Sequence, residues 1–397
     1  MASDPMRASS EQASTSPRGL IMATALTLGV VAVVVLATTL LLSLVSSLRR
    51  TLVTTGAPTN LIVLRKGSTN DGSSALPLEA YQAVRYFDGI AKGPDGDPLV
   101  SPELVVQPFF VRRDGGRENV LVRGVEPVAL AVHDSVKIVE GRMFEPSKGE
   151  VIVGTGVAGR YAGAAVGQDL KFGRGTWKVV GRFESAGDSF ESEVWADVRE
   201  LARDAKRPLP YSGFRVRAAP GADLDALARR IGDEPRWSLE AQRETEYYAE
   251  QSKSANTLYA IVIGLAVLSG IGAICGATNT LYASVQARTA EIGTLRALGF
   301  SRGAILTAFL IESLLMAGAG FAVGGALAAI LAAAISHALG GVGFSAVTFT
   351  TNVIALRVGA FDLAWAALLS ALIGLIGGWF PALRAARLRP VEALRRA

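Results

Sequence analysis

The side chains that most often do chemistry in proteins are scarce in this chain. Its one cysteine, Cys275, lies inside an apolar stretch, so neither an intramolecular disulfide nor a cysteine-based metal site can form. The two histidines, His133 and His337, stand far apart and have no acidic residues beside them at ligand spacing. No serine is flanked by glycines as in an esterase, and two histidines leave few general-base schemes. The sequence predicts no metal site and no catalytic residue, and we expect no enzyme activity from this chain.

Nucleotide-binding motifs are incomplete or absent. The glycines of residues 154–159 follow the strand-like run 151–153, which superficially matches a dinucleotide fingerprint. That fingerprint needs a second strand that ends in an acid about 20 residues further on. Here the following residues indicate short antiparallel strands with tight turns, so we interpret the glycines as a structural turn. No Walker A motif occurs, and we expect ATP and Mg²⁺ to bind a separate subunit and no cofactor to bind this chain.

The rest of the chain is rich in apolar runs. Half of the 397 residues are hydrophobic and 19% are charged, a mixture that indicates membrane segments plus an extramembrane domain. The basic residues lie largely beside apolar runs, so the net charge of +5 does not indicate nucleic acid. A helix crosses a bilayer core of about 30 Å with roughly 20 apolar residues. Four such runs occur, at Leu20–Val45, Ser254–Ala287, Ile305–Ser336 and Phe361–Pro381.

The first run is longer than the roughly 7–15 residues of a signal-peptide core, and we interpret it as an uncleaved anchor. Basic residues in short loops predict the cytoplasmic side: Arg288, Arg296 and Arg302 join the second and third runs, and five arginines follow the fourth. Arg49 and Arg50 oppose the rule, but they open a long domain in which the bias is weak. Both termini are therefore expected in the cytoplasm.

These features predict nine segments. They are a cytoplasmic N-terminus (1–19), transmembrane helices at 20–48, 254–285, 303–338 and 359–383, an extracytoplasmic domain (49–253), a cytoplasmic helix (286–302), an outer loop (339–358) and a cytoplasmic tail (384–397). Within residues 51–250, short strand-like runs alternate with helical ones between glycine and proline turns. The expected fold is a four-helix membrane protein with a large α+β domain inserted between the first and second helices.

The segment between the second and third runs predicts a short amphipathic helix. Ile292, Leu295, Leu298 and Gly299 fall on one side of it. The charged residues Arg288, Glu291 and Arg296 cluster toward the other side. Gly299 suits the end of this helix and Ser301 the start of the next. The pattern alone fits an interfacial anchor or a positive-inside loop as well as a docking helix.

The residues Arg288-Thr-Ala-Glu-Ile-Gly-Thr-Leu-Arg-Ala-Leu-Gly299, with Glu312 downstream and the basic segment Pro381–Arg395, resemble the MacB/FtsX-type ABC permease family. The resemblance is close over about residues 250–397. It implies a cytoplasmic coupling helix that docks on an ABC ATPase dimer, and a second permease copy or a paralogue. It also implies the inner membrane of a bacterium, membrane lipids around the helices, and a periplasmic adaptor with an outer-membrane channel.

Glycine pairs in three of the apolar runs predict close helix packing. The pairs are Gly272 with Gly276, Gly320 with Gly324, and Gly374 with Gly378. We favour packing within the chain over a dimer seam. Glu312 is costly inside an apolar run and is expected near the cytoplasmic boundary, where it pairs with Arg296 or Arg302 or serves coupling.

The leading functional hypothesis is transport, in which ATP-driven motion exports or extracts a lipoprotein, lipid, peptide or amphiphilic drug from the outer side. One alternative is an FtsX-like mechanotransmission protein that regulates a cell-wall hydrolase. Another, of a different class, is a membrane-anchored sensor or scaffold that never meets an ATPase.

Overall fold

The computed structural model describes residues 17–339, 342–344 and 352–389, and its chain divides into two compact units. The helical unit comprises Met1–Ser46, Thr257–Ala334 and Arg357–Ala397. The sheet unit comprises Ser47–Asn256 and Ile335–Leu356. The large α+β region therefore follows the first apolar helix, as the sequence predicts.

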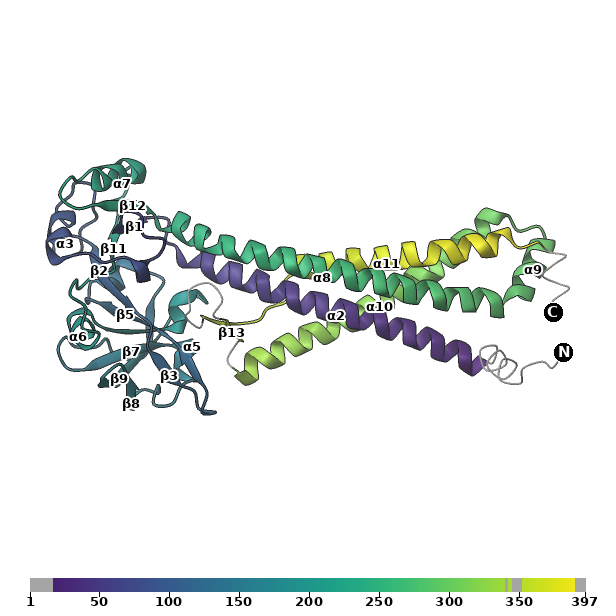
Figure 1. Cartoon of the computed structure of the whole chain (residues 1–397), viewed down its shortest axis with the longest axis horizontal. Coiled ribbons are helices and arrows are strands. Elements are labelled where there is room, and N and C mark those ends of the chain that lie inside the picture. Colours follow the sequence, from purple (N-terminus) through teal and green to yellow (C-terminus); the bar gives the residue numbers. More distant parts are fainter. Residues whose placement is uncertain (1–16, 340–341, 345–351, 390–397) are drawn as a thin grey trace. The chain divides into compact units, whose positions relative to one another are not determined.

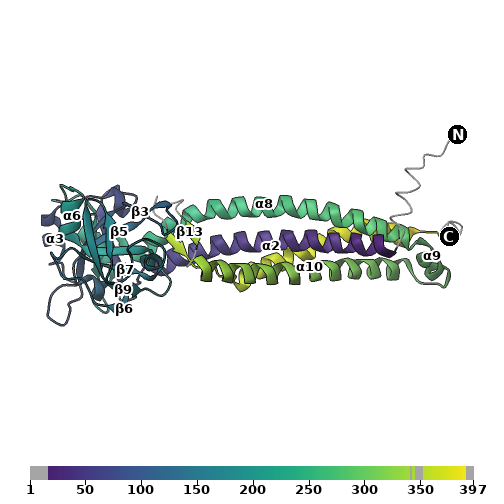
Figure 2. The same cartoon turned by 90° about the horizontal axis from the view of Figure 1, so that it is seen from below.

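The helical unit is built from long apolar helices that run side by side in both views (Figures 1 and 2). Among the described residues, four helices are long and apolar enough to cross a membrane, which confirms the predicted number. The helices are α2 (Pro17–Thr55), α8 (Glu244–Ala287), α10 (Arg302–Leu339) and α11 (Ala360–Arg387), with the short α9 (Thr289–Ala297) between α8 and α10. Helices α2 and α8 extend beyond the predicted spans, so each contributes residues to both units.

The sheet unit centres on a ten-stranded mixed sheet in the order β12-β1-β11-β2-β5-β10-β7-β9-β6, with β8 paired to β9. Most neighbours are antiparallel, and the pairs β5–β10 and β7–β9 are parallel. The strands are β1 (Asn60–Arg65), β2 (Val100–Val106), β5 (Leu121–Val125), β6 (Lys137–Gly141), β7 (Glu150–Gly154), β8 (Asp169–Phe172), β9 (Gly175–Glu184), β10 (Glu193–Asp197), β11 (Gly213–Arg217) and β12 (Leu239–Arg243). Two hairpins stand apart from this sheet: β3 (Phe109–Val111) with β4 (Arg117–Asn119), and β13 (Val342–Phe344) with β14 (Asn352–Ile354).

Both faces of the sheet are covered. Side chains alternate between the two faces along each strand, so one strand can contribute to the apolar clusters on both sides. On one face, Val151, Val153 and Val194 belong to the main apolar core. Its helices are α3 (Leu78–Val84), α5 (Thr155–Ala158), α6 (Val198–Asp204) and α7 (Leu224–Gly232). On the other face, Ile152 and Trp195 pack with Phe190 of the 3-10 helix η2 (Ser189–Ser192) and with α4 (Ala129–Val132). The first residues of α8 cover the β1 end of that second face through Tyr247 and Tyr248.

The glycine-rich segment after β7 is a structural turn and a single helical turn, α5. The predicted antiparallel strands after it are present as β8 and β9. The sheet differs from the expectation in one respect, since β7 itself pairs with β9 in parallel. The pairing of β7 with β9 forms only when the sheet assembles, and the residues of the turns between these strands do not predict it.

Candidate coupling site

Helix α9 is defined at both boundaries by hydrogen bonds that its sequence supplies. Gly299 has a φ of +96° and ends the helix in a conformation that a side chain disfavours. The amide of Phe300 donates to the carbonyl of Leu295 at 3.2 Å and that of Gly299 to Arg296 at 3.3 Å, which is the Schellman arrangement. The Ser301 hydroxyl then accepts from the Ala304 amide at 3.1 Å and caps α10. The predicted helix stop and start are both present.

The apolar residues of α9 divide between two environments. Ile292 is 3% exposed, whereas Leu295 is 38% and Leu298 73% exposed. The residue after the helix stop, Phe300, is also half exposed. The predicted single apolar side is therefore split. Ile292 faces the chain's own long helices, whereas the described residues leave an apolar patch of Leu295, Leu298 and Phe300 uncovered.

Ile292 joins α9 to three long helices of the helical unit. It packs in a buried cluster with Val285 of α8, with Ile305 and Phe309 of α10, and with the alanines of α11. Interiors of this kind are close-packed, so a displacement of one member moves its neighbours. Helix α9 is therefore packed against the ends of α8, α10 and α11 through this cluster.

The charged residues of this region form a small exposed network. The guanidinium of Arg288 lies 3.2 Å from Glu291 and 3.4 Å from Glu312, and all three side chains are two-fifths exposed or more. Glu312 thus pairs with Arg288, and neither of the predicted partners forms this bridge. Arg302 opens α10 about 15 Å of helix away from Glu312, and Arg296 instead donates to the Phe300 carbonyl at 2.8 Å.

The three glycine pairs have different surroundings. A methyl group on Gly320 or Gly324 would collide with α2 at Val31, Ala32 and Val35, and one on Gly374 or Gly378 would collide with Ala317 and Ser313 of α10. These contacts hold α10 close to α2 and α11. Among the described residues, nothing lies within 4 Å of a methyl on Gly272 or Gly276 of α8.

Hydroxyl groups reinforce the close helix contacts. Ser313 donates to the carbonyl of Gly374 at 2.6 Å, and Ser370 donates to the carbonyl of Ala317 at 2.7 Å. Ser46 of α2 donates to Asp362 of α11 at 3.0 Å. Such bonds between apolar helices contribute of order 0.6–2 kcal/mol each and fix the helix register.

A second charged cluster, which the sequence analysis missed, lies on the second face of the sheet. We call it the buried ion network. Its members are Glu103, Arg123, Glu193, Arg215 and Glu244, with His133 and Asp71 at its edge. They come from β2, β5, β10, β11 and the first residue of α8.

The geometry of the buried ion network is tight. Arg123 contacts Glu193 at 2.6 Å and Glu103 at 2.8 Å, and its guanidinium lies 5.3 Å from the centre of the Phe190 ring. Arg215 contacts Glu244 at 3.1 Å, and both side chains are fully buried. This last contact fastens the start of α8 to the middle of the sheet.

Burial and charge oppose each other in this network. Burial alone would raise the pKa of Glu103, but Arg215, His133 and Arg123 outweigh it and hold that pKa well below its usual range. For Glu193, burial prevails over Arg123 and raises the pKa. The sequence carries only a partial signal for the network: Arg123 is the one charged residue of β5, whereas β10 and β11 each hold a second charged residue.

A nearby carboxyl group is also perturbed. Asp188 caps η2 by accepting from the Phe190 amide at 2.9 Å and also accepts from the Ser185 hydroxyl at 2.6 Å. Burial raises the pKa of Asp188 to about 7, against these hydrogen bonds.

Together, the apolar helices, the inserted sheet unit and the short α9 define a multi-pass membrane protein with a large extramembrane domain. Two family models match the chain: the MacB-like periplasmic core domain over residues 24–234 and the FtsX-like permease C-terminal over residues 263–390. The chain belongs to the MacB/FtsX-type family of ABC transporter permeases, and the sheet unit is its periplasmic domain.

Curated relatives agree with this assignment. The macrolide export ATP-binding/permease protein MacB of Shewanella oneidensis is 37% identical over 59% of this chain and 35% of its own length. An uncharacterized ABC transporter permease of Methanocaldococcus jannaschii is 27% identical over 65% of each chain. The chain thus spans about a third of the MacB relative. The solved periplasmic region of MacB from Actinobacillus actinomycetemcomitans aligns with 48% of this chain and 91% of that one, at 9% identity and a TM-score of 0.38.

Proposed function

We propose that this chain is the permease subunit of an ABC transporter and passes ATP-driven motion from a cytoplasmic ATPase to its periplasmic sheet unit. The observation that carries the proposal is the divided helix α9. Its buried Ile292 locks it onto three long helices, while Leu295, Leu298 and Phe300 present an uncovered apolar patch beside Arg288 and Glu291. A docking surface of this kind gains affinity from apolar anchors and register from charge pairing.

In this mechanism ATP and Mg²⁺ bind the partner ATPase, and no cofactor binds the permease chain. Motion of α9 passes through the Ile292 cluster into α8, and along that helix to Glu244 in the buried ion network. This route requires α9 and both termini to lie on the cytoplasmic side of a bacterial inner membrane. The basic residues of α9 and the tail support that orientation.

The work done on the periplasmic side is the export or extraction of a lipoprotein, lipid, peptide or amphiphilic drug, together with a periplasmic adaptor and an outer-membrane channel. The match to the MacB-like periplasmic core domain and to a macrolide exporter supports this over regulation of a cell-wall hydrolase. Capture of a hydrolase by the sheet unit would favour the FtsX-like mechanotransmission alternative. Failure of any ATPase to co-purify in nanodiscs would favour the sensor or scaffold alternative.

The decisive experiment changes the uncovered patch. Leu295→Asp combined with Glu291→Lys should abolish binding and stimulation of the co-expressed ABC ATPase, while the permease still reaches the membrane. Val139→Asp, at an equally exposed apolar residue of β6, is the matched control and should leave the ATPase coupled. Unchanged ATPase binding in the α9 variant would refute the proposal.

A second copy of the chain is the proposed partner in the membrane. One side of α8 carries Gly272, Gly276 and the exposed Asn279, and the two glycines have no neighbour within 4 Å among the described residues. Small residues let a second helix approach closely in a membrane, and a polar side chain adds a hydrogen bond between the helices. The exposed Cys275 between the glycines offers a direct test. Oxidation in nanodiscs should give a disulfide-linked dimer. A variant with Cys275→Ser and Leu331→Cys, which moves the thiol to an exposed site on α10, should give no disulfide-linked dimer. The reverse pattern would place the seam elsewhere.

A further inference from the structure

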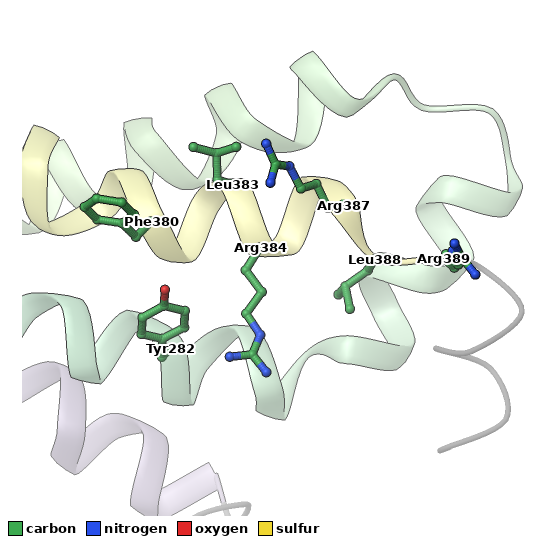
Figure 3. Close-up of a pocket in the computed structure, with 7 residues that line it drawn as sticks. All are labelled: Tyr282, Phe380, Leu383, Arg384, Arg387, Leu388 and Arg389. Atoms are coloured by element: carbon green, nitrogen blue, oxygen red, sulfur yellow. The ribbon is translucent and has the colours of Figure 1, made fainter.

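A cationic pocket of about 650 Å³ lies beside the last turns of α11 and the end of α8 (Figure 3). The side chains stand around it: Tyr282 and Arg384 on one side, Leu383 and Arg387 on the other, and Phe380 at one end. Arg389 contributes a third cation to the lining. No acidic side chain lines this pocket among the described residues.

Two arginines of this pocket, Arg384 and Arg387, have no ion pair within the described part of the chain. Arg384 lies over the Tyr282 ring, with its guanidinium carbon 5.6 Å from the ring centre. This cation–π contact orients the group without cancelling its charge. Within residues 17–339, 342–344 and 352–389, neither Arg384 nor Arg387 has a carboxylate within ion-pair distance. The pocket lining therefore carries two guanidinium groups without an ion-pair partner, and the Tyr282 ring orients that of Arg384.

The order of residues along α11 matches the layers of a bilayer. Trp379 and Phe380 are exposed and apolar, and the arginines follow them toward the end of the helix. From Phe380 to Arg387 the helix rises about 10 Å. The headgroup layer on each side of a bilayer core is about 5–8 Å thick, so this rise is enough to carry the helix from the edge of the core through that layer. Acyl chains would contact Phe380 and Leu383, and a headgroup would lie at the level of the arginines.

We propose that this pocket binds the phosphate of an anionic phospholipid headgroup in the leaflet on the α9 side. The guanidinium group suits this role because its planar fork of donors pairs with phosphate oxygens. The aromatic and leucine side chains add contact with the glycerol and upper acyl region, which a phosphate free in water lacks. The lipid bridges α8 and α11 where both meet the Ile292 cluster.

The test uses the full chain in phosphatidylcholine nanodiscs with and without phosphatidylglycerol, with no ATPase present. Lipids retained after release from the discs are counted by native mass spectrometry, and thermal unfolding is followed in parallel. Phosphatidylglycerol should be retained and should raise the unfolding temperature. The single variants Arg384→Gln and Arg387→Gln should each lower phosphatidylglycerol retention about fivefold, since a cation near an anionic surface contributes about 1 kcal/mol. Arg384→Lys with Arg387→Lys should restore most of it.

Arg302→Gln is the matched control, because Arg302 is an exposed arginine outside the pocket lining at the start of α10. Equal loss of phosphatidylglycerol in this control would show a diffuse surface charge and overturn the proposal. Equal stabilisation of phosphatidylcholine samples by inorganic phosphate would also overturn the lipid assignment. Full lipid retention in the glutamine variants would overturn the lipid assignment; if the same variants also fail to bind the ABC ATPase in a separate co-purification, the arginines belong to a contact with an acidic protein surface instead.

Discussion

The chain contains two charged clusters that differ in almost every physical respect. The buried ion network of the sheet unit places two arginines and three glutamates out of contact with water, at 2.6–3.1 Å for its closest pairs. The cluster at α9 is exposed, with Arg288 at 3.2 and 3.4 Å from its two acids. Breaking a buried pair costs about 3–5 kcal/mol because it strands a charge, whereas exposed pairs contribute about 0–1 kcal/mol.

This difference indicates two separate tasks. A network that is costly to break suits a fixed joint. Through its bond with Arg215, Glu244 holds the first turn of α8 on the sheet. A weak exposed cluster costs little to rearrange, so its charges are available to another protein.

Arg215→Met should destabilise the protein by about 3–5 kcal/mol, because Glu244 loses its buried arginine partner and Glu103 keeps only Arg123 and His133 beside its buried charge. The measurement is thermal or denaturant unfolding of the full chain in detergent, followed by tryptophan fluorescence, since Trp195 lies beside the network. Arg236→Gln, at an exposed pair with Glu234, is the control and should change little. The double variant Arg215→Met with Glu244→Gln should be more stable than Arg215→Met alone. Equal stability of Arg215→Met and wild type would show that the network is no joint.

Asp188→Asn should remove a pH dependence from the stability of the sheet unit. The pKa of Asp188 is raised to about 7 in the folded protein, so its protonated form is favoured by folding. The stability that protonated Asp188 contributes is complete below the ordinary aspartate pKa near 4, and it is lost as the pH rises through about 7. At pH 8 the variant should be more stable than wild type by about 2–4 kcal/mol, and at pH 4 nearly equal.

Unfolding temperatures across this pH range measure the Asp188 effect. Asp225→Asn is the control of opposite sign, because the hydrogen bond from Arg243 lowers the pKa of the exposed Asp225. Its contribution should appear as the pH rises through the ordinary aspartate range, and it should not change near pH 7. A wild-type stability that is flat between pH 4 and 8 would contradict the assignment to Asp188.

Gly324→Ala should destabilise the helical unit by about 1–3 kcal/mol, because its methyl group would collide with the Ala32 carbonyl oxygen of α2. Gly272→Ala is the matched change on α8, where the methyl meets open space within the described residues, and it should not destabilise the monomer. Unfolding in detergent, with the oligomeric state measured by light scattering, compares the two. Equal destabilisation would mean that both glycine pairs pack within one chain.

Arg288→Gln should change the unfolding free energy by no more than about 1 kcal/mol, since its ion pairs are exposed. Its effect should appear in the rate of ATP hydrolysis by a co-reconstituted ABC ATPase, because in the proposed function the charge next to the α9 patch sets the docking register. We therefore expect Arg215→Met to lower the stability of the fold, and Arg288→Gln to lower ATP hydrolysis with little change in stability. A large loss of stability in Arg288→Gln would remove this distinction.

Several local features of α9 could be read from the sequence. Gly299 and Ser301 mark the boundary between α9 and α10 because a positive φ and a hydroxyl cap are needed at those positions. The partner of Glu312 could not be read in this way. It depends on how α9 folds back toward α10, and residues 24 positions apart in sequence meet there.

The charged strand residues show the same limit. Arg123 and Arg215 look like ordinary solvent-facing positions of an alternating strand, because the sequence does not show that the second face of the sheet is covered. Once η2 and the start of α8 cover that face, the same side chains are fully buried and must be paired.

The sequence by itself determined the four apolar helices, the α+β domain inserted after the first of them, and the short helix between the second and third. These depend on composition and on periodicity over neighbouring residues, which a single chain displays directly. The tertiary structure alone decided which glycine pairs are filled, which residues of α9 face inward, and which charges are buried together. Those outcomes depend on contacts between residues distant in sequence, and their energies exist only when the helices and strands have assembled.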